Sequence, residues 1–175
     1  MKHELSLRRV VEDDLALLEE LTQDPEAAGE FEWFGWRNLH LFRHDWAEHG
    51  LITDDRGVLM VVQNAEVLGV VDYRRRSSTP TAFYFEIGII LSAGARGQGY
   101  GSVAQRMLAE YLFAHTTVHR VEANTEIDNL AEQRALEKAG FTREGVIRAG
   151  GWRDGRWRDG VRYSLLRTDL PAQGS

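Results

Sequence analysis

A strand, a glycine-rich turn and a helix follow one another without a break between Phe83 and His115. Phe83 to Leu91 is rich in aromatic and β-branched residues and apolar on both alternating faces, which predicts a strand inside a sheet covered on both sides. Gly97 to Gly101 then places three glycines in five positions, too many for a helix or strand interior but suited to a tight turn. From Ser102 apolar residues recur at helical spacing, so we expect a helix directly after the turn.

This order of elements suits the binding of an anion. The first turn of a helix has N–H groups without intrahelical partners, and the helix dipole adds partial positive charge there. A P-loop would need Lys followed by Ser or Thr after the last glycine, whereas Gly101 is followed by Ser102 and Val103. A dinucleotide fold would need a fuller glycine fingerprint and repeated parallel βαβ halves, which the sequence does not indicate. Neither of these two phosphate sites is favoured.

The pattern Arg-x-x-Gly-x-Gly at 96–101 resembles the pyrophosphate loop of the GCN5-related N-acetyltransferase (GNAT) superfamily. The block from Asn129 to Phe141 resembles the helix that follows the fifth strand in the same superfamily. In the tail, Glu144–Arg148 and Tyr163–Arg167 resemble the RimJ/RimL-like branch, which acetylates the N-termini of ribosomal proteins. The resemblance runs from about Leu5 to Leu170, and its three motifs come in the order and spacing of the family.

The resemblance implies an α/β fold of the GNAT acyl-CoA N-acyltransferase type. We expect a mixed, mostly antiparallel twisted sheet of about seven strands, with helices on both faces and a parallel pair that splays apart in the middle. A single GNAT domain over residues 1–170 fits a chain of 175 residues with 43% hydrophobic content. Residues 171–175 are expected to form a disordered tail.

Local patterns predict further elements. Val58–Val62 and Val67–Tyr73 read as a hairpin, after which Arg74–Arg76 lead into a polar loop up to Thr81. Pro25 is expected to end the first helix, because proline disfavours helical geometry in the preceding residue. Asp128 is a plausible N-cap for the helix from Asn129, and Asp154-Gly155 a turn in the last hairpin.

Composition excludes several classes of protein. The sequence has no run of eighteen apolar residues and no charged-then-apolar leader, so we expect a cytoplasmic protein without membrane association. The absence of cysteine rules out disulfides, thiolate zinc sites and a cysteine nucleophile. His40, His44 and His49 lack an obvious third metal ligand, so no metal is expected. The net charge of −6, without a basic and aromatic stripe, argues against nucleic-acid binding.

Charge is divided unevenly along the chain. Residues 1–70 carry 15 acidic against 6 basic side chains, while residues 71–175 carry 12 against 15. An anionic cofactor at the basic part and a cationic amine drawn to the acidic part would fit this division, since local fields steer charged ligands. Solvation of helix faces is the alternative explanation for most of the acidic residues.

The segment from Glu30 to Trp36 holds four aromatic residues and no clean period. It could be a lid over the core, or the wall of an acceptor pocket that binds an amine through cation–π contacts and charge. In the resembled superfamily this region varies with the acceptor. The candidate acceptor residues are Glu30, Trp33, Phe34 and Trp36.

Glu86 is the candidate general base. It lies in the middle of a strand that is apolar on both faces, where a carboxylate needs either a partner or a catalytic task. Partial burial would raise its pKa towards that of a useful base. Superfamily members often carry a catalytic glutamate on this strand. An ion pair with an arginine of a neighbouring strand is the alternative.

The resemblance also implies the cofactor site. Acetyl-CoA would be the cosubstrate, with a backbone N–H near Ile89 to Leu91 as oxyanion donor and Asn129 on the pantetheine or the reacting groups. The residues expected at the cofactor are Ile89, Ile90, Leu91, Arg96, Gly97, Gln98, Gly99, Tyr100, Gly101, Ser102 and Asn129, and those expected in catalysis are Glu86 and Asn129.

The sequence departs from the family at the general acid. Many members carry a tyrosine seven residues after the Asn, where this chain has Leu136, and RimJ/RimL-like members often have a serine three residues after it, where this chain has Glu132. Glu132 could protonate the thiolate if buried, a thiolate can also leave unaided, and Tyr100, Ser102 and Tyr163 are weaker substitutes. The acid is therefore left unassigned.

The functional hypothesis is an acetyl-CoA-dependent N-acetyltransferase of RimJ/RimL type. The amine, on a small cationic molecule such as an antibiotic or on a protein N-terminus, would attack the thioester directly while both are bound. A CoA-binding sensor without transferase activity is the alternative, and another phosphate ligand such as a nucleotide is a third. A monomer and a homodimer are both compatible with the sequence, which leaves open the acceptor and acyl chains longer than acetyl.

Overall fold

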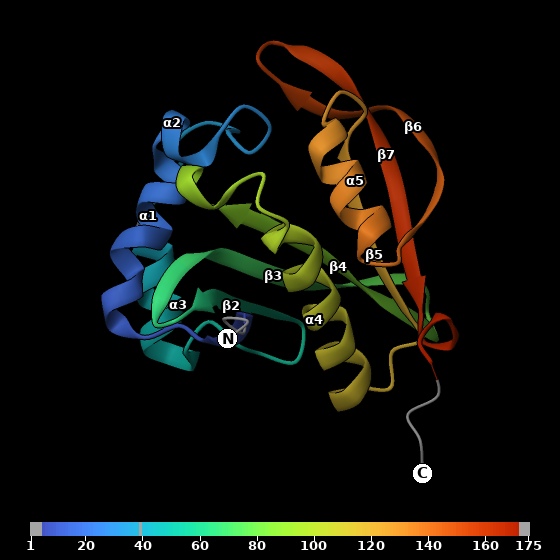
Figure 1. Ribbon diagram of the computed structural model, residues 1–175, viewed down its shortest axis with the longest axis horizontal. Helices are drawn as coiled ribbons and strands as arrows, with labels where there is room; N and C mark the ends of the chain where they lie inside the picture. Colours follow the sequence, from blue (N-terminus) through green and yellow to red (C-terminus); the bar gives the residue numbers. More distant parts are fainter. Residues whose placement is uncertain (1–4, 39, 172–175) are drawn as a thin grey trace.

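A computed structural model describes residues 5–38 and 40–171. In this part of the chain seven strands form one sheet in the order β1-β2-β3-β4-β5-β7-β6 (Figure 1). Neighbouring strands are antiparallel except for β4 and β5, which are parallel. The strands are β1 (Leu5–Arg9), β2 (Arg56–Gln63), β3 (Glu66–Thr79), β4 (Ala82–Leu91), β5 (Arg120–Glu126), β6 (Thr142–Arg153) and β7 (Arg156–Leu166). The predicted mixed, mostly antiparallel sheet is confirmed.

Helices cover both faces of the sheet, as expected (Figure 1). They are α1 (Leu15–Gln23), α2 (Pro25–Ala28), α3 (His40–His49), α4 (Tyr100–His115) and α5 (Leu130–Lys138). On one face α4 and α5 bury Leu108 and Leu136 against Val71 and Phe85 of the sheet. On the other face α1 buries its leucines against alternate residues of β2 and β3, and α3 packs beside it. Two apolar layers therefore hold the sheet between them.

The sheet opens between β4 and β5. Strand β4 pairs with β3 along almost its whole length, but its ladder with β5 covers only Phe85–Ile87. Beyond Ile87 the two parallel strands diverge, which is the predicted splayed pair. A Cβ on Gly101 of α4 would lie within 4.0 Å of Ile89, Leu91 and Ala135, so the first turn of α4 packs closely against β4 and α5 beside the opening.

Strand β3 is longer than the sequence predicted. The expectation of a polar loop after Arg76 is wrong, because β3 continues to Thr79 and pairs Arg74 with Glu86 and Arg76 with Tyr84 of β4. Hydrophobic alternation failed to show this extension because its side chains are exposed on both faces.

Two helix starts also differ from the expectations. Asn129, not Asp128, caps α5, since its Oδ1 accepts the N–H of Glu132 at 3.2 Å. Pro25 follows the end of α1 but also begins α2, where Asp24 accepts the N–H groups of Glu26 and Ala27. Proline suits a first helical position because its missing N–H has no intrahelical task there.

Both predicted hairpin turns are present. Asn64 and Ala65, and Asp154 and Gly155, have positive φ, which suits two-residue turns between antiparallel strands. In the described residues no helix is long and apolar enough to cross a membrane. Leu39 and the expected tail beyond Pro171 lie outside the described residues.

Candidate active site

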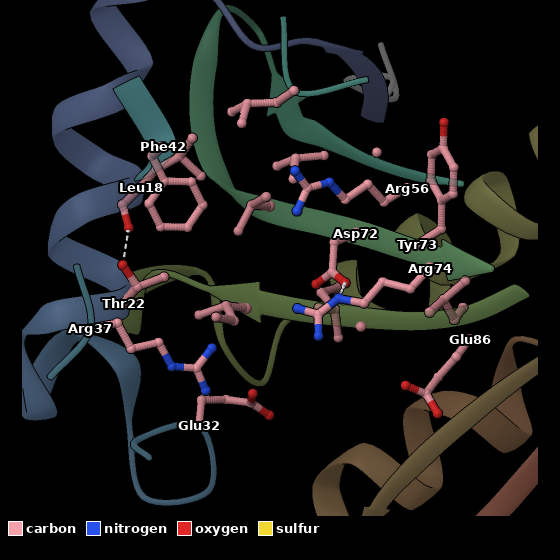
Figure 2. Close-up of a pocket in the computed structure, with 18 of the residues that line it drawn as sticks. Leu18, Thr22, Glu32, Arg37, Phe42, Arg56, Asp72, Tyr73, Arg74 and Glu86 are labelled. Carbon is pink, nitrogen blue, oxygen red and sulfur yellow. Dashed lines mark hydrogen bonds and ion pairs between the residues drawn. The ribbon is translucent and has the colours of Figure 1, made fainter. Parts of the chain in front are cut away.

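A cleft of about 720 Å³ lies on the sheet face that carries α1 and α3. Its walls come from α1, α3 and the segment after α2, and its floor from β3 and β4 (Figure 2). It extends to the opening of the sheet, where Ala123, Asn124 and Thr125 of β5 and Glu132 of α5 contribute to the lining. The sheet face under α1 and α3 and the opening between β4 and β5 therefore share one cavity.

The glycine loop leads into α4 with an exposed backbone. Gly97 and Gly99 have φ of +73° and +86°, and no described atom would lie within 4 Å of a Cβ added to either. The hydroxyl of Ser102 donates to the carbonyl of Gly99 at 2.8 Å. Helix α4 is sixteen residues long, so an anion at this loop would meet free N–H groups and the positive end of a helix dipole.

Three other expected cofactor residues make contacts within the protein. Arg96 donates to the carbonyls of Leu91, Ala27 and Ala28, and so ties α2 to the end of β4. Gln98 donates to the carbonyl of Gly94, and the Tyr100 hydroxyl donates to Gln63 at 2.8 Å. These contacts shape the loop, while Ile89 and Ile90 line the cleft and Leu91 packs against the core.

Glu86 lines the cleft and is partnered on both sides. Its carboxylate accepts from Arg76 at 3.0 Å and from the Asn124 amide at 3.1 Å, and its side chain is 30% exposed. The ion pair that the sequence left open as an alternative is therefore present. Because Glu86 also lines the cleft, a group bound there can contact this carboxylate.

Asp72, which the sequence analysis did not single out, lies beside Gly88 at the start of the opening. A Cβ on Gly88 would come within 2.9 Å of the Asp72 carboxylate, and Arg74 approaches that carboxylate only to 3.7 Å (Figure 2). Burial raises the pKa of Asp72, Arg74 opposes this shift, and Glu86 adds to it. The sequence did offer a signal for Asp72. It lies between Val71 and Tyr73 in a strand, so its side chain must point to the sheet face opposite theirs.

Two glutamates from distant parts of the chain meet in the cleft. Burial, together with the charges of Asp72 and Glu126, raises the pKa of Glu32 to about 7, although Arg96 and Arg153 oppose the shift. Burial and the charge of Glu32 raise the pKa of Glu132 to about 8. The Glu32 side chain is itself exposed to solvent, which weakens the shift of its pKa, whereas the Glu132 side chain is partly buried.

The aromatic segment contributes to the cleft unevenly. Phe34 lines it, as does Glu32, which projects into it beside Arg37 (Figure 2). Glu30, Trp33 and Trp36 do not line it; the two tryptophans stack edge to face at 6.0 Å, and Trp36 is 83% exposed.

The segment is anchored at its start. The guanidinium of Arg153, which is 5% exposed, lies 5.4 Å from the centre of the Phe31 ring and binds both carboxylate oxygens of Glu126. The β6–β7 hairpin thus holds the start of the aromatic segment of residues 30–36.

Asn129 lies at the N-terminus of α5 and serves as its cap, so its side-chain oxygen is already used by the protein. Its amide nitrogen has no partner among the described residues. In the same part of the chain no group of three or more His, Asp or Glu side chains is placed to hold a metal, and His40 and His44 are exposed.

The sequence matches one family model and, over shorter stretches, two relatives. Residues 4–142 match the family model described as an acetyltransferase (GNAT) domain. A stretch of 66 residues is 39% identical to the probable N-acetyltransferase YjcK of Bacillus subtilis, and one of 56 residues is 39% identical to the uncharacterized N-acetyltransferase YjdG of the same organism. These stretches cover 38% and 32% of this chain, and only 35% and 33% of the two relatives.

Solved structures share the fold over nearly the whole chain. Spermidine N-acetyltransferase from Vibrio cholerae, crystallised with CoA and spermine, superposes with a TM-score of 0.78 at 18% identity and covers 94% of this chain and 96% of its own. A structure described as a probable acetyltransferase gives 0.76 at 21% identity, with 97% and 96% covered.

Proposed function

Because the chain belongs to the GNAT acetyltransferase family, we propose that it transfers an acetyl group from acetyl-CoA to a primary amine on a small cationic molecule. The observation that carries this proposal is the single cleft that joins the opening of the sheet to a wall of carboxylates. The opening offers an unpaired strand edge for the pantetheine arm, and the carboxylates offer a site for an ammonium group.

The cofactor would enter from the glycine loop. Its pyrophosphate would take the N–H groups at the start of α4, and its pantetheine arm would pair along β4 beyond Ile87 like an added strand. In this arrangement the thioester would lie at the opening, where a backbone N–H near Ile89 to Leu91 would stabilise the oxyanion. The two exposed glycines of the loop leave room for the phosphates.

The acceptor would enter between α1, α3 and the segment after α2. Asp72 and Glu32 attract its positive charge, and Phe34 offers an aromatic face for a cation. Glu86 takes a proton from the attacking amine, and the amine then attacks the thioester while both substrates are bound. The neighbour of known structure that was crystallised with spermine has a polycationic ligand, which supports this class of acceptor.

A protein N-terminus is the other acceptor that the resemblance suggests. It also carries one positive charge, but it brings a chain that must leave the cleft. We favour a small molecule because α3 and the aromatic segment both border the cleft.

Calorimetric titration with acetyl-CoA, CoA and ATP tests the cofactor. We expect saturable binding of both CoA species and none of ATP. A screen of amines by release of the CoA thiol then tests the reaction, with diamines and polyamines compared with an N-terminal peptide. Binding of CoA without turnover of any amine would favour the silent CoA sensor, and binding of ATP in place of CoA would contradict the loop assignment.

A further inference from the structure

The reaction proposed above needs a proton for the departing thiolate, and four side chains were left as candidates by the sequence. Three of them are placed elsewhere. The Tyr163 hydroxyl is fully buried and hydrogen-bonds Gln133 and Glu137. The Tyr100 hydroxyl donates to Gln63, and the Ser102 hydroxyl to the carbonyl of Gly99. None of these three lines the cleft.

Glu132 is the fourth candidate, and it does line the cleft, together with Ile87, Gly88 and Ile89 of β4. It projects from the first turn of α5, where its own N–H is fixed by the Asn129 cap. Its neighbour one turn on, Leu136, is fully buried in the core, which directs this face of α5 inward. The side chain is thereby held at the opening of the sheet, where the thioester is placed by the proposed function.

Gln105 of α4 is the neighbour of Glu132 that favours the charged form. Its side chain is 1% exposed and donates to the carbonyl of Gly101 at 3.2 Å. As a donor to the Glu132 carboxylate it lowers the pKa of that group, but burial and the charge of Glu32 outweigh this effect. The place of Glu132 at the opening is thus fixed from α5, through the Asn129 cap.

We propose that Glu132 is the general acid of the transfer and that Glu32, which lines the same cleft, is a positioning residue for it. The inference rests on the proposed function. The amine nitrogen forms a bond to the thioester carbon and passes its proton to a carboxylate. The C–S bond then breaks with its electron pair on sulfur, and Glu132 gives its proton to that thiolate. Solvent returns a proton to Glu132 after the CoA thiol has left.

The charges around the pair support this assignment. Burial and the carboxylate of Glu32 raise the pKa of Glu132 to about 8, so it carries a proton at neutral pH. Glu32 faces Asp72 of β3 and Glu126 of β5, which raise its own pKa, and Arg96 and Arg153, which lower it. Two coupled carboxyls of this kind share protons over a range in which one is charged and the other neutral.

The test is Glu132→Gln, which keeps the shape of the side chain but cannot give up a proton. We expect kcat to fall about 100-fold, with the KM for acetyl-CoA unchanged, because general acid catalysis contributes about 10²- to 10⁴-fold. The alkaline limb of the pH profile of kcat should disappear. Glu66→Gln, an exposed carboxyl at the start of β3, is the matched control and should leave both kcat and its pH profile unchanged.

A change of leaving group separates chemistry from structure. Acetyl-seleno-CoA releases a selenolate, which needs less protonation than a thiolate, so it should restore most of the rate lost in Glu132→Gln. Glu32→Gln should move the alkaline limb of the kcat profile to lower pH and also raise the KM for the amine, since Glu32 lines the cleft proposed for the acceptor. An equal loss of rate with acetyl-CoA and with acetyl-seleno-CoA would contradict the role of Glu132. A kcat of Glu132→Gln within about threefold of the wild type would contradict it too.

A measurement without turnover keeps this inference separate from the proposed function. The ultraviolet absorbance of the thiolate reports the titration of CoA bound to the protein. A carboxylate beside the sulfur makes deprotonation harder, so the bound thiol should titrate at higher pH in the wild type than in Glu132→Gln. Coincident curves would exclude contact with the sulfur, whether or not any amine is acetylated, whereas a wild type inactive on every amine would count against the proposed function alone.

Discussion

Gly99 is the residue at which the proposed cofactor site can be tested most directly. Its φ of +86° is in the region that favours glycine, and the space around it is open. Gly99→Asp would place a strained residue and a negative charge where the pyrophosphate is expected. We expect the affinity for CoA to fall more than about tenfold, since an anion loses a site at which fixed N–H groups and a helix dipole act together. Calorimetric titration measures this loss.

Gly155→Asp is the matched control for that substitution. Gly155 also has a positive φ, +73°, and open space around it, but it lies in the turn of the β6–β7 hairpin. It should therefore show the cost of an aspartate in this backbone conformation without an effect on CoA. Unchanged affinity in a folded Gly99→Asp protein would contradict the loop assignment.

Sequence reasoning at the residue scale worked best where a residue type has one clear use. The glycines of the loop, the aspartate and glycine of the last turn and the mid-strand position of Glu86 were all predicted, because each depends on local backbone geometry or strand alternation. Asp72 and Glu32 were not assigned roles in the cleft. Asp72, Glu32 and Glu132 line one cleft and affect one another's charge. They come from three segments that are distant in sequence, and contact between such segments leaves no local pattern in the sequence.

At the scale of elements, the β6–β7 hairpin anchors the aromatic segment of residues 30–36 through Arg153. We expect Arg153→Ala to lower the free energy of unfolding by about 3–5 kcal/mol, because it leaves the carboxylate of Glu126, which is only 14% exposed, without its partner. The KM for the amine should also rise, since Phe31 loses its cation–π contact. Urea denaturation and steady-state kinetics measure the two effects.

Arg156→Ala is the control for the hairpin, because Arg156 is exposed and has no ion pair among the described residues. It should change stability by less than about 0.5 kcal/mol, as surface substitutions usually do. If the Arg153→Ala protein were as stable as this control, the contacts of Arg153 would not stabilise the fold.

The elements themselves were predicted to different degrees. Strands with one buried face and helices with an apolar stripe were found, since burial gives them a period. The outer half of β3 was missed because Arg74–Arg76 and the residues after them are exposed on both sides. Its strand geometry is imposed by pairing with β4, and pairing with a partner leaves no signal in the sequence of the exposed strand.

At the scale of the whole molecule, two cleft carboxyls with a raised pKa make stability depend on pH, the partly buried Glu132 more than the exposed Glu32. The pKa of Glu32 in the folded protein is about 7 and that of Glu132 about 8, both above the value of 4.5 for an ordinary glutamate. Between about pH 5 and pH 8 the folded state therefore holds protons that the unfolded state has lost. Stability must fall as the pH rises through this window, because added base favours the state with fewer protons.

Urea denaturation at several pH values checks this expectation. The wild type should lose stability from about pH 5 to pH 8, and Glu132→Gln should lose less, since an amide has no proton to release. Carboxylates whose pKa is lowered by arginines, such as Asp14, Glu126 and Glu144, titrate below this window and do not mask the effect. Parallel curves for wild type and variant would contradict the raised pKa of Glu132.

The short ladder between β4 and β5 also divides the cooperativity of the fold. Strands β1 to β4 form one continuous set of pairings and β5 to β7 another, and three residues of β4 join them. The contact between α4 and α5 adds to this joint. One core cluster, which includes Phe85, Val121 and Tyr163, still spans both halves, so packing rather than hydrogen bonds joins them. We therefore expect the two halves to differ in the free energy of local opening. A ligand that pairs along the free edge of β4 would make the sheet one cooperative unit, and substrate binding would then be read out as a change in how the molecule unfolds.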